Sequence, residues 1–165
     1  MVVATDVRFR TDEPTKTPDD FFIMLKNGGR SVAVIDEMYV QALYMVSKKI
    51  LPDEPNYFGA SVQDLVTPPI FPSDTKIVAI HVGDKIVPGP EGRLSNITPE
   101  ERLNRVKSGD IPFNIYGFVK YRTGIDADPR QRMSGFCYTY VPLPYRGGIG
   151  PQFTTCDKPK YTYAR

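Results

Sequence analysis

Short runs of strand-forming residues, interrupted by turn residues, constrain the fold of this chain most. An early run, Phe21–Lys26, is followed by Asn27-Gly28-Gly29 and then by a long apolar-rich segment, Ser31–Val46. Val, Ile, Phe and Tyr favour β-strands, and Asn and Gly between two such runs are typical of a β-hairpin. We therefore expect a strand, a tight turn with positive φ angles and a second strand here.

A second hairpin is predicted late in the chain. Phe113–Arg122 and Met133–Val141 are both rich in aromatic and β-branched residues. The segment that joins them, Thr123–Arg132, contains glycine, proline and two aspartates, as hairpin loops often do. These two runs predict an antiparallel strand pair.

Local patterns predict four further elements. Val2–Arg10 alternates loosely and predicts a first edge strand, and Lys76–Val82 alternates more cleanly. Pro99–Ser108 is the clearest helix, because Thr98 can cap its N-terminus and proline suits its first position. Ile50–Pro72 contains several prolines and is expected to run over the surface.

These elements fit one β domain. A chain of 165 residues, of which 41% are hydrophobic, is long enough to bury a core in a single domain. About seven short strands and one short helix predict a mostly β protein, an antiparallel β-sandwich, with a small β-barrel as the alternative. We place the domain at residues 1–142 and expect 143–165 to form an extended tail, rich in Pro, Gly and Tyr, on the domain or on a partner.

Charge and hydropathy exclude two classes of function. Basic residues number 21 and acidic residues 19, and the densest basic spots, Lys48-Lys49 and Arg130 with Arg132, are short. We interpret them as solvated loop charges rather than a nucleic-acid surface. No apolar run approaches the ~20 residues that cross a bilayer, and residues 1–6 become polar too early for a signal peptide. The chain as given is expected to be soluble, and its strand-like start would also suit a fragment of a longer protein.

The two cysteines leave the redox compartment open. Cys137 lies in an alternating strand pattern, and Cys156 lies in the predicted tail. We favour a buried free thiol at Cys137 over a disulfide. We expect neither a metal nor a cofactor, since His81 is the one histidine and neither cysteine has a close Cys or His partner.

Four segments together resemble a known group of proteins. They are Leu25–Ala33, Pro88-Gly89, Tyr116–Arg122 and Phe136–Tyr138. An Asn-x-Gly-(Arg/Lys)-(Ser/Thr)-x-Ala turn and a Tyr-Gly-x-x-x-Tyr-Arg strand before Phe-Cys-Tyr are similar to those of one domain type. It is the soluble immunoglobulin-like domain of uncharacterised bacterial membrane-anchored proteins.

The resemblance implies an immunoglobulin-like version of the sandwich and a membrane-anchored parent protein. In that group an N-terminal membrane helix precedes the domain, and basic residues after the helix favour a cytoplasmic face. A membrane association of this chain is therefore expected only through a segment absent from it. The group brings no known activity, ligand or catalytic residue.

Candidates for catalysis are few. His81 shares a predicted strand face with Ile77 and Ala79, so we interpret it as a core-edge histidine rather than a general base. Neighbouring carboxylates such as Asp36 and Glu37 are expected to point to opposite faces of a strand, which makes them poor acid–base partners.

Two loop patterns are weak candidates for ligand binding. Asp126 and Asp128 are spaced like cation ligands, but the other positions of an EF-hand loop are missing, and a solvated hairpin loop is favoured. The glycine-rich segment Gly147–Gly150 lacks the strand–helix context of a phosphate site.

Aromatic residues alternate along the two late strands: Tyr116, Phe118, Tyr121, Phe136, Tyr138 and Tyr140. Cross-strand aromatic pairs stabilise a sheet by roughly 0.2–1 kcal/mol each. Half of these side chains are expected to face away from the core. With Lys120, Arg122 and Arg132 beside them, an exposed tyrosine-rich face is a candidate surface for a protein or a nucleotide-like ligand.

Our first functional hypothesis is a non-enzymatic sensor or protein-interaction domain. Its surface is the late hairpin with residues 50–72, and its candidate binding residues are Lys120, Tyr121, Arg122, Arg132, Tyr138 and His81. The alternative is a small-ligand receptor, with His81, Arg122 and Tyr138 lining a pocket at one end of the sandwich. A hydrolase that uses His81 with an acidic loop residue has the weakest support.

Overall fold

The computed structural model describes residues 1–9, 20–44, 51, 53–55, 57, 61–63, 68–81, 87–88, 97–124, 131–142 and 152–164. The strands in these ranges are β1 (Val2–Phe9), β2 (Asp20–Asn27), β3 (Ala33–Tyr44), β4 (Ser61–Gln63), β5 (Thr75–His81), β6 (Val87–Pro88), β7 (Phe113–Thr123), β8 (Gln131–Val141) and β9 (Gln152–Thr155). The helix is α1 (Pro99–Ser108). Among the described residues, no helix has the length and apolar character to span a membrane.

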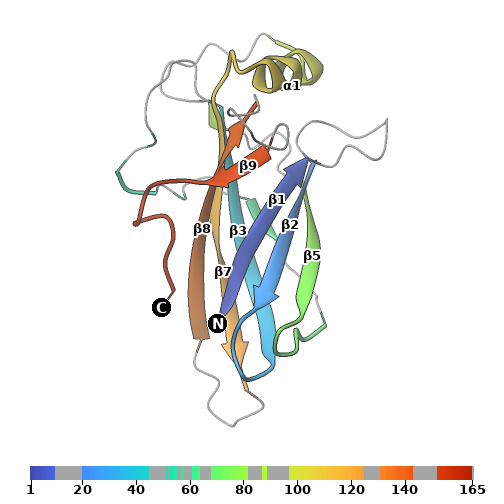
Figure 1. Cartoon of the computed structure of the whole chain (residues 1–165), viewed down its shortest axis with the longest axis vertical. Coiled ribbons are helices and arrows are strands. Elements are labelled where there is room, and N and C mark those ends of the chain that lie inside the picture. Colours follow the sequence, from blue (N-terminus) through green and yellow to red (C-terminus); the bar gives the residue numbers. More distant parts are fainter. Residues whose placement is uncertain are drawn as a thin grey trace, which may run out of the picture.

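The strands form two sheets that pack face to face (Figure 1). The small sheet has the order β1-β2-β5, and the large sheet has the order β4-β3-β7-β8-β9. Strand pairs are antiparallel, except that the short β6 adds to β3 in parallel. This architecture confirms the predicted β-sandwich over the small barrel.

The core lies between the sheets, where alternate residues of each strand point inward. The small sheet contributes Phe21, Ile23, Leu25, Val78 and Ile80, and the large sheet contributes Met38, Val40, Ile115, Val119, Tyr121 and Phe136. Aromatic rings fill one end of this layer: Phe9, Phe21, Phe113, Tyr140 and Phe153, with centroid distances of 5.1–6.4 Å. This ring cluster replaces tryptophan, which the sequence lacks.

The predicted early hairpin is wrong. β2 pairs with β1 and β5 in the small sheet, whereas β3 pairs with β7 in the large sheet. The connection therefore crosses from one sheet to the other, and neither Gly28 nor Gly29 has a positive φ. Asn27 organises this crossing, because its buried side-chain amide donates to the carbonyls of Ser31 and Ile70 at 2.8 and 2.9 Å. Its Oδ1 accepts from the Gly29 N–H, which is an Asx turn rather than a hairpin turn.

The late hairpin, the strands predicted at Val2–Arg10 and Lys76–Val82 and the helix are confirmed. β7 and β8 pair from Asn114↔Thr139 to Arg122↔Gln131, and β1 is an edge strand. The Thr98 hydroxyl accepts from the Glu101 N–H at the start of α1. The helix lies at one end of the sandwich (Figure 1) and buries Val106 there. The expectation that Ile50–Pro72 runs over the surface is wrong in part, because β4 pairs with β3 and Leu51 and Ile70 are buried.

The described part of the predicted tail forms part of the sandwich. β9 pairs with the end of β8, and further along the same edge the Gly135 N–H donates to the Tyr163 carbonyl at 2.7 Å. Tyr161, between these two contacts, is fully buried. The described part of the tail thus lies on the domain along the edge of β8, one of the two alternatives that the sequence left open.

Cys137 and Cys156 form a disulfide, so the favoured free thiol at Cys137 is wrong. The two residues are 19 apart in the sequence, but the pairing of β9 with β8 brings their Cα atoms to 5.3 Å. The backbone N–H of Cys156 also donates to the Cys137 carbonyl at 3.0 Å. This proximity depends on the strand pairing, which the spacing of the cysteines does not reveal.

A substitution at Gly117, in the middle of β7, tests how tightly the large sheet is packed. A Cβ there would overlap the carbonyl oxygen of Tyr39 and lie 2.8 Å from the Phe136 ring. We expect Gly117→Ala to lower the free energy of unfolding by about 1–3 kcal/mol. Gly28→Ala is the matched control, because its nearest neighbour would be 3.9 Å away. Urea unfolding measures both, and equal midpoints for the two variants would contradict this packing.

Candidate functional site

The candidate residues of the late hairpin separate onto the two faces of the large sheet. Tyr121 and Tyr138 point into the core and are only 1% and 5% exposed. Lys120 and Arg122 flank Tyr121 in the sequence and therefore lie on the outer face. Tyr121 is thus a core residue, and a binding role on the outer face remains open only to Lys120 and Arg122.

The predicted exposed tyrosine-rich face is wrong, because other aromatic side chains cover it. The outward residues Tyr116 and Phe118 are only 3% and 8% exposed. The Tyr57 ring contacts Phe118 edge-on at 4.8 Å, and the Tyr161 ring contacts Tyr116 edge-on at 5.0 Å. A second, smaller core therefore lies outside the sheet: Leu43, Leu51, Tyr116, Cys137 and Tyr161.

The remaining candidates lie apart from one another. Arg132 is exposed near the start of β8. The backbone of His81 ends β5 in the small sheet, opposite Asp20, and its side chain lies outside what the structure describes. The predicted end pocket of His81, Arg122 and Tyr138 does not form, since Arg122 is on the outer face of the large sheet and Tyr138 on its inner face.

Four charged residues form two ion pairs on the outer face, and we call them the charged quartet: Asp36, Glu37, Lys120 and Arg122. The pairing of β3 with β7 shifts between Ile35 and Glu37, and such a bulge places two successive residues on one side of a strand. The two neighbouring carboxylates therefore share a face, contrary to the expected alternation.

In the charged quartet, each basic side chain donates a hydrogen bond to one carboxylate. Arg122 donates to Asp36 at 2.8 Å, and Lys120 donates to Glu37. This hydrogen bond raises the pKa of Lys120. The Lys120 ammonium also lies 5.1 Å from the centre of the Tyr39 ring, a cation–π distance. Because each cation has a carboxylate partner, the quartet is a neutral surface rather than a basic patch.

An open groove of about 620 Å³ lies next to the quartet on the same face, and we call it the tyrosine groove. It is lined by Glu54, Pro55, Tyr57, Pro159, Lys160 and Tyr163. Phe118 connects the two features, since its ring contacts Tyr57 at 4.8 Å and lies 5.8 Å from the Lys120 ammonium. The groove and the quartet are therefore neighbours on the outer face, with the buried Phe118 ring between them.

Two segments distant in the sequence build the tyrosine groove. Lys158 pairs with Asp53 at 2.9 Å and Lys160 with Glu54 at 2.7 Å, which lowers the pKa of both carboxyls. The Tyr161 hydroxyl donates to the Glu54 carbonyl at 3.3 Å. Burial and the nearby Tyr163 raise the pKa of the Tyr57 hydroxyl above its ordinary value.

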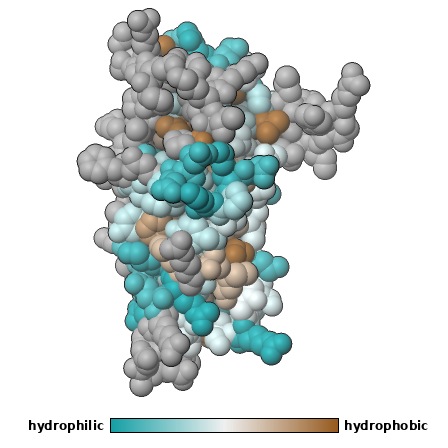
Figure 2. Space-filling model, turned by 90° about the vertical axis from the view of Figure 1, so that its left-hand side faces the viewer, coloured by the Kyte–Doolittle hydropathy of each residue, from teal (hydrophilic) through white to brown (hydrophobic). Residues whose placement is uncertain are grey.

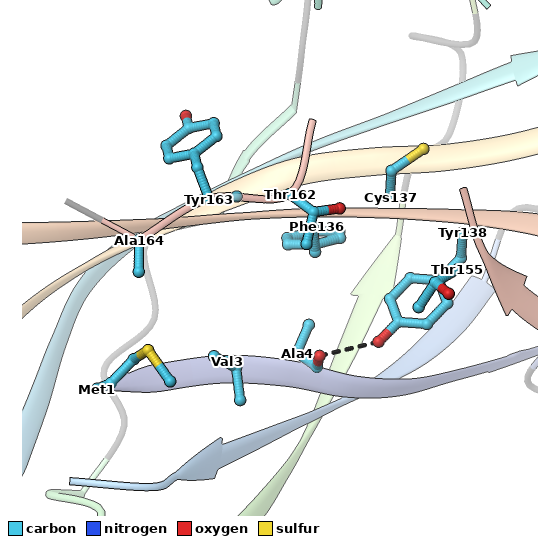
Figure 3. A pocket seen from close by; sticks show the side chains of 11 residues that line it. Met1, Val3, Ala4, Phe136, Cys137, Tyr138, Thr155, Thr162, Tyr163 and Ala164 are labelled. Carbon is cyan, nitrogen blue, oxygen red and sulfur yellow. Dashed lines mark hydrogen bonds between the residues drawn. The ribbon is translucent and has the colours of Figure 1, made fainter. Parts of the chain in front are cut away.

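A second hollow, the edge slot, opens between β1 and β8 and has a volume of about 290 Å³. It is lined by Met1, Val3, Ala4, Gly135, Phe136, Cys137, Tyr138, Thr155, Thr162, Tyr163 and Ala164. Figure 2 faces this side of the molecule and shows apolar atoms gathered between hydrophilic ones. In Figure 3 the Tyr138 hydroxyl reaches across to the Ala4 carbonyl, to which it donates at 2.8 Å. Burial raises the pKa of Tyr138 to about 12.

The described residues contain no group of three or more His, Cys, Asp or Glu side chains that could hold a metal ion. Asp126 and Asp128, the candidate cation ligands, lie outside the described residues, as does Gly147–Gly150.

The sequence reasoning included residues 50–72, and with them Tyr57, in the candidate surface, but it missed Lys160 and Tyr163 of the tyrosine groove. Residues 50–72 were predicted as a surface segment, but nothing in the sequence pairs them with the end of the chain. The one available signal was the abundance of tyrosine and proline in the predicted tail.

No protein-family model, curated protein or solved structure matches this chain.

Tyr138→Phe tests the hydrogen bond across the edge slot. Removing the hydroxyl is expected to lower the free energy of unfolding by about 1 kcal/mol at pH 7. The folded-state pKa of Tyr138 is raised from 10.0 to about 12, so its contribution is present below pH 10 and is lost as the pH rises through 12. The variant should therefore lose less stability than the wild type across this window in urea unfolding. Equal alkaline losses would contradict the raised pKa.

Proposed function

We propose that this protein is a non-enzymatic protein-interaction domain that binds an extended, proline-containing segment of a partner protein in the tyrosine groove. The observation that carries the proposal is the composition of the groove. Its lining combines two half-buried tyrosines, Tyr57 and Tyr163, with two prolines and the Lys160–Glu54 ion pair. Rings with a polar tip offer large contact areas at little cost in side-chain entropy.

The partner class follows from the shape and chemistry of the groove. Extended proline-rich segments bind surfaces lined with aromatic rings, because their backbone loses little entropy on binding. The Lys160 ammonium at the rim can donate hydrogen bonds to the carbonyl groups that such a segment exposes. The charged quartet extends the surface along β7, which keeps Lys120 and Arg122 as candidate partner contacts.

The groove is held in place by the structure beneath it. Tyr163 is anchored by the Gly135 N–H, and the segment that carries it begins at the Cys137–Cys156 disulfide. A surface that is already ordered pays less entropy on binding. This rigidity supports a recognition role.

The disulfide supports a second part of the proposal, that the domain works in an oxidising compartment. Disulfides persist outside the cytosol and are rare within it. This placement differs from the cytoplasmic face that the sequence resemblance implies. Anchoring of a longer parent protein to a membrane, and an immunoglobulin-like version of the sandwich, remain proposals that rest on that resemblance.

The edge slot favours a second candidate function, a receptor for a small apolar ligand. Its volume is at the low end for ligand pockets, and none of its described lining residues is lysine or arginine. The nucleotide-like ligand considered above therefore gains no support from it. A rise in melting temperature on adding indole would favour this candidate.

Peptides selected from a random display library against the immobilised domain test the main proposal. We expect enriched peptides to contain proline and to lose roughly tenfold or more in affinity for Tyr163→Ala and Lys160→Glu. Lys160 is 61% exposed, so its charge reversal leaves the core intact. Lys107→Glu, on the exposed side of α1, is the matched control and should bind like the wild type. Enriched peptides that bind all four proteins equally, or no enrichment at all, would overturn the proposal.

A further inference from the structure

The two edges of the small sheet are protected unequally. β1 has a bulge between Ala4 and Asp6, and Asp6 pairs with Arg8 at 2.7 Å. The Ala4 carbonyl, which faces the edge, accepts the hydroxyl of Tyr138. Bulges and charges of this kind keep an edge strand from pairing with another chain. The edge formed by β1 is therefore protected against pairing with another chain.

β5, the other edge, has neither a bulge nor a proline. Its seven residues pair with β2 in an unbroken register. Ile77 is 60% exposed, and Phe71, just before the strand, is 59% exposed. Two of the three large apolar side chains exposed in the described residues thus lie on or beside β5.

The backbone of β5 also has groups that pair with no residue in the described ranges. The Asn27 N–H donates to the Asp74 carbonyl, which fixes the alternation of the antiparallel ladder. Lys76, Val78 and Ile80 therefore bond to β2, whereas Ile77 and Ala79 direct their N–H and C=O groups to the open edge. In the part of the chain that is described, no other strand pairs with this edge.

We propose that two copies of this chain associate through β5, edge to edge and antiparallel, so that the sheets join in the order β1-β2-β5-β5-β2-β1. β5 is complementary to itself. The register that overlaps the whole strand places Val78 on the two-fold axis and pairs Ile77 of each copy with Ala79 of the other. Lys76 then lies opposite Ile80, so no two like charges meet across the junction. The contact is isologous and closed, as a two-fold dimer requires.

The dimer does not depend on the proposed function. β5 belongs to the small sheet, and the tyrosine groove lies on the outer face of the large sheet, so pairing leaves the groove open in both copies. Two grooves in one particle would raise the avidity for a partner with two binding segments. A single strand edge buries less than the ~1,600 Å² of a standard interface, so the association is weak.

Sedimentation equilibrium of the full chain from about 10 to about 500 μM tests the proposal. We expect the average mass to rise from 18.6 kDa for one chain towards twice that value. Ala79→Pro should remain a single chain throughout, because it removes an N–H that faces the open edge and that β2 does not use. Ala79→Val keeps this N–H and is the matched control, expected to associate like the wild type.

A second edge variant and hydrogen exchange test the same association independently of Ala79→Pro. Ile77→Lys places a charge on the edge and should also abolish association, even if Ala79→Pro perturbs the fold. Hydrogen exchange at the two ends of the concentration range should show new protection at the Ile77 and Ala79 amides in the wild type. A wild type of constant single-chain mass, or a dimer that persists in both edge variants, would overturn the proposal.

Discussion

The Cys137–Cys156 disulfide joins β8 to the residue that follows β9, on the outer face of the large sheet. This cross-link holds in place the segment that covers part of the outer face of β7 and β8, where Tyr116 and Cys137 are buried. Beyond Cys156, the chain returns over the sheet, buries Tyr161 against Tyr116 and brings Tyr163 to Gly135. A cross-link between residues 19 apart stabilises a fold by about 3 kcal/mol in the loop-entropy account. The tyrosine groove exists only while this segment stays on the sheet.

Glycine makes the close approach of this segment possible. A Cβ at Gly135 would lie 2.6 Å from the Tyr163 ring and 2.7 Å from the Tyr161 carbonyl oxygen, so the chain could not reach the β8 edge over any larger residue. Gly117 allows a different close contact, within the large sheet, with the Tyr39 backbone of β3 and the Phe136 ring of β8. The covering segment and the residues beneath it are therefore matched in shape, which single-strand propensities do not report.

The sequence predicted the elements whose signals are local. Alternation identified β1 and β5, the turn residues between aromatic runs identified the β7–β8 hairpin, and Thr98 identified the start of α1. Long-range pairing was not predictable in the same way. Asn27-Gly28-Gly29 has the composition of a hairpin turn, but the side chain of Asn27 bonds across to Ile70 and directs the chain into the other sheet.

The candidate site was predicted only in part, for the same reason. Lys120, Tyr121 and Arg122 were placed in one candidate surface, whereas alternation along the strand puts Tyr121 in the core and Lys120 and Arg122 on the outer face. Their pairing with Asp36 and Glu37 depends on a bulge in β3, which the alternation rule does not anticipate. The burial of Tyr116 depends on Tyr57 and Tyr161, which come from distant segments. Strand patterns show which residues share a face but not what covers that face.

Hydrogen exchange at single amides, in the oxidised and the reduced protein, tests most directly whether the cross-link holds the covering segment in place. The Gly135 and Cys156 amides bond to the Tyr163 and Cys137 carbonyls, whereas the Ile115 amide lies in the centre of the large sheet. If the account is right, reduction will speed exchange at Gly135 and Cys156 by roughly tenfold or more and leave Ile115 protected. Unchanged protection at Gly135 and Cys156 after reduction would contradict it.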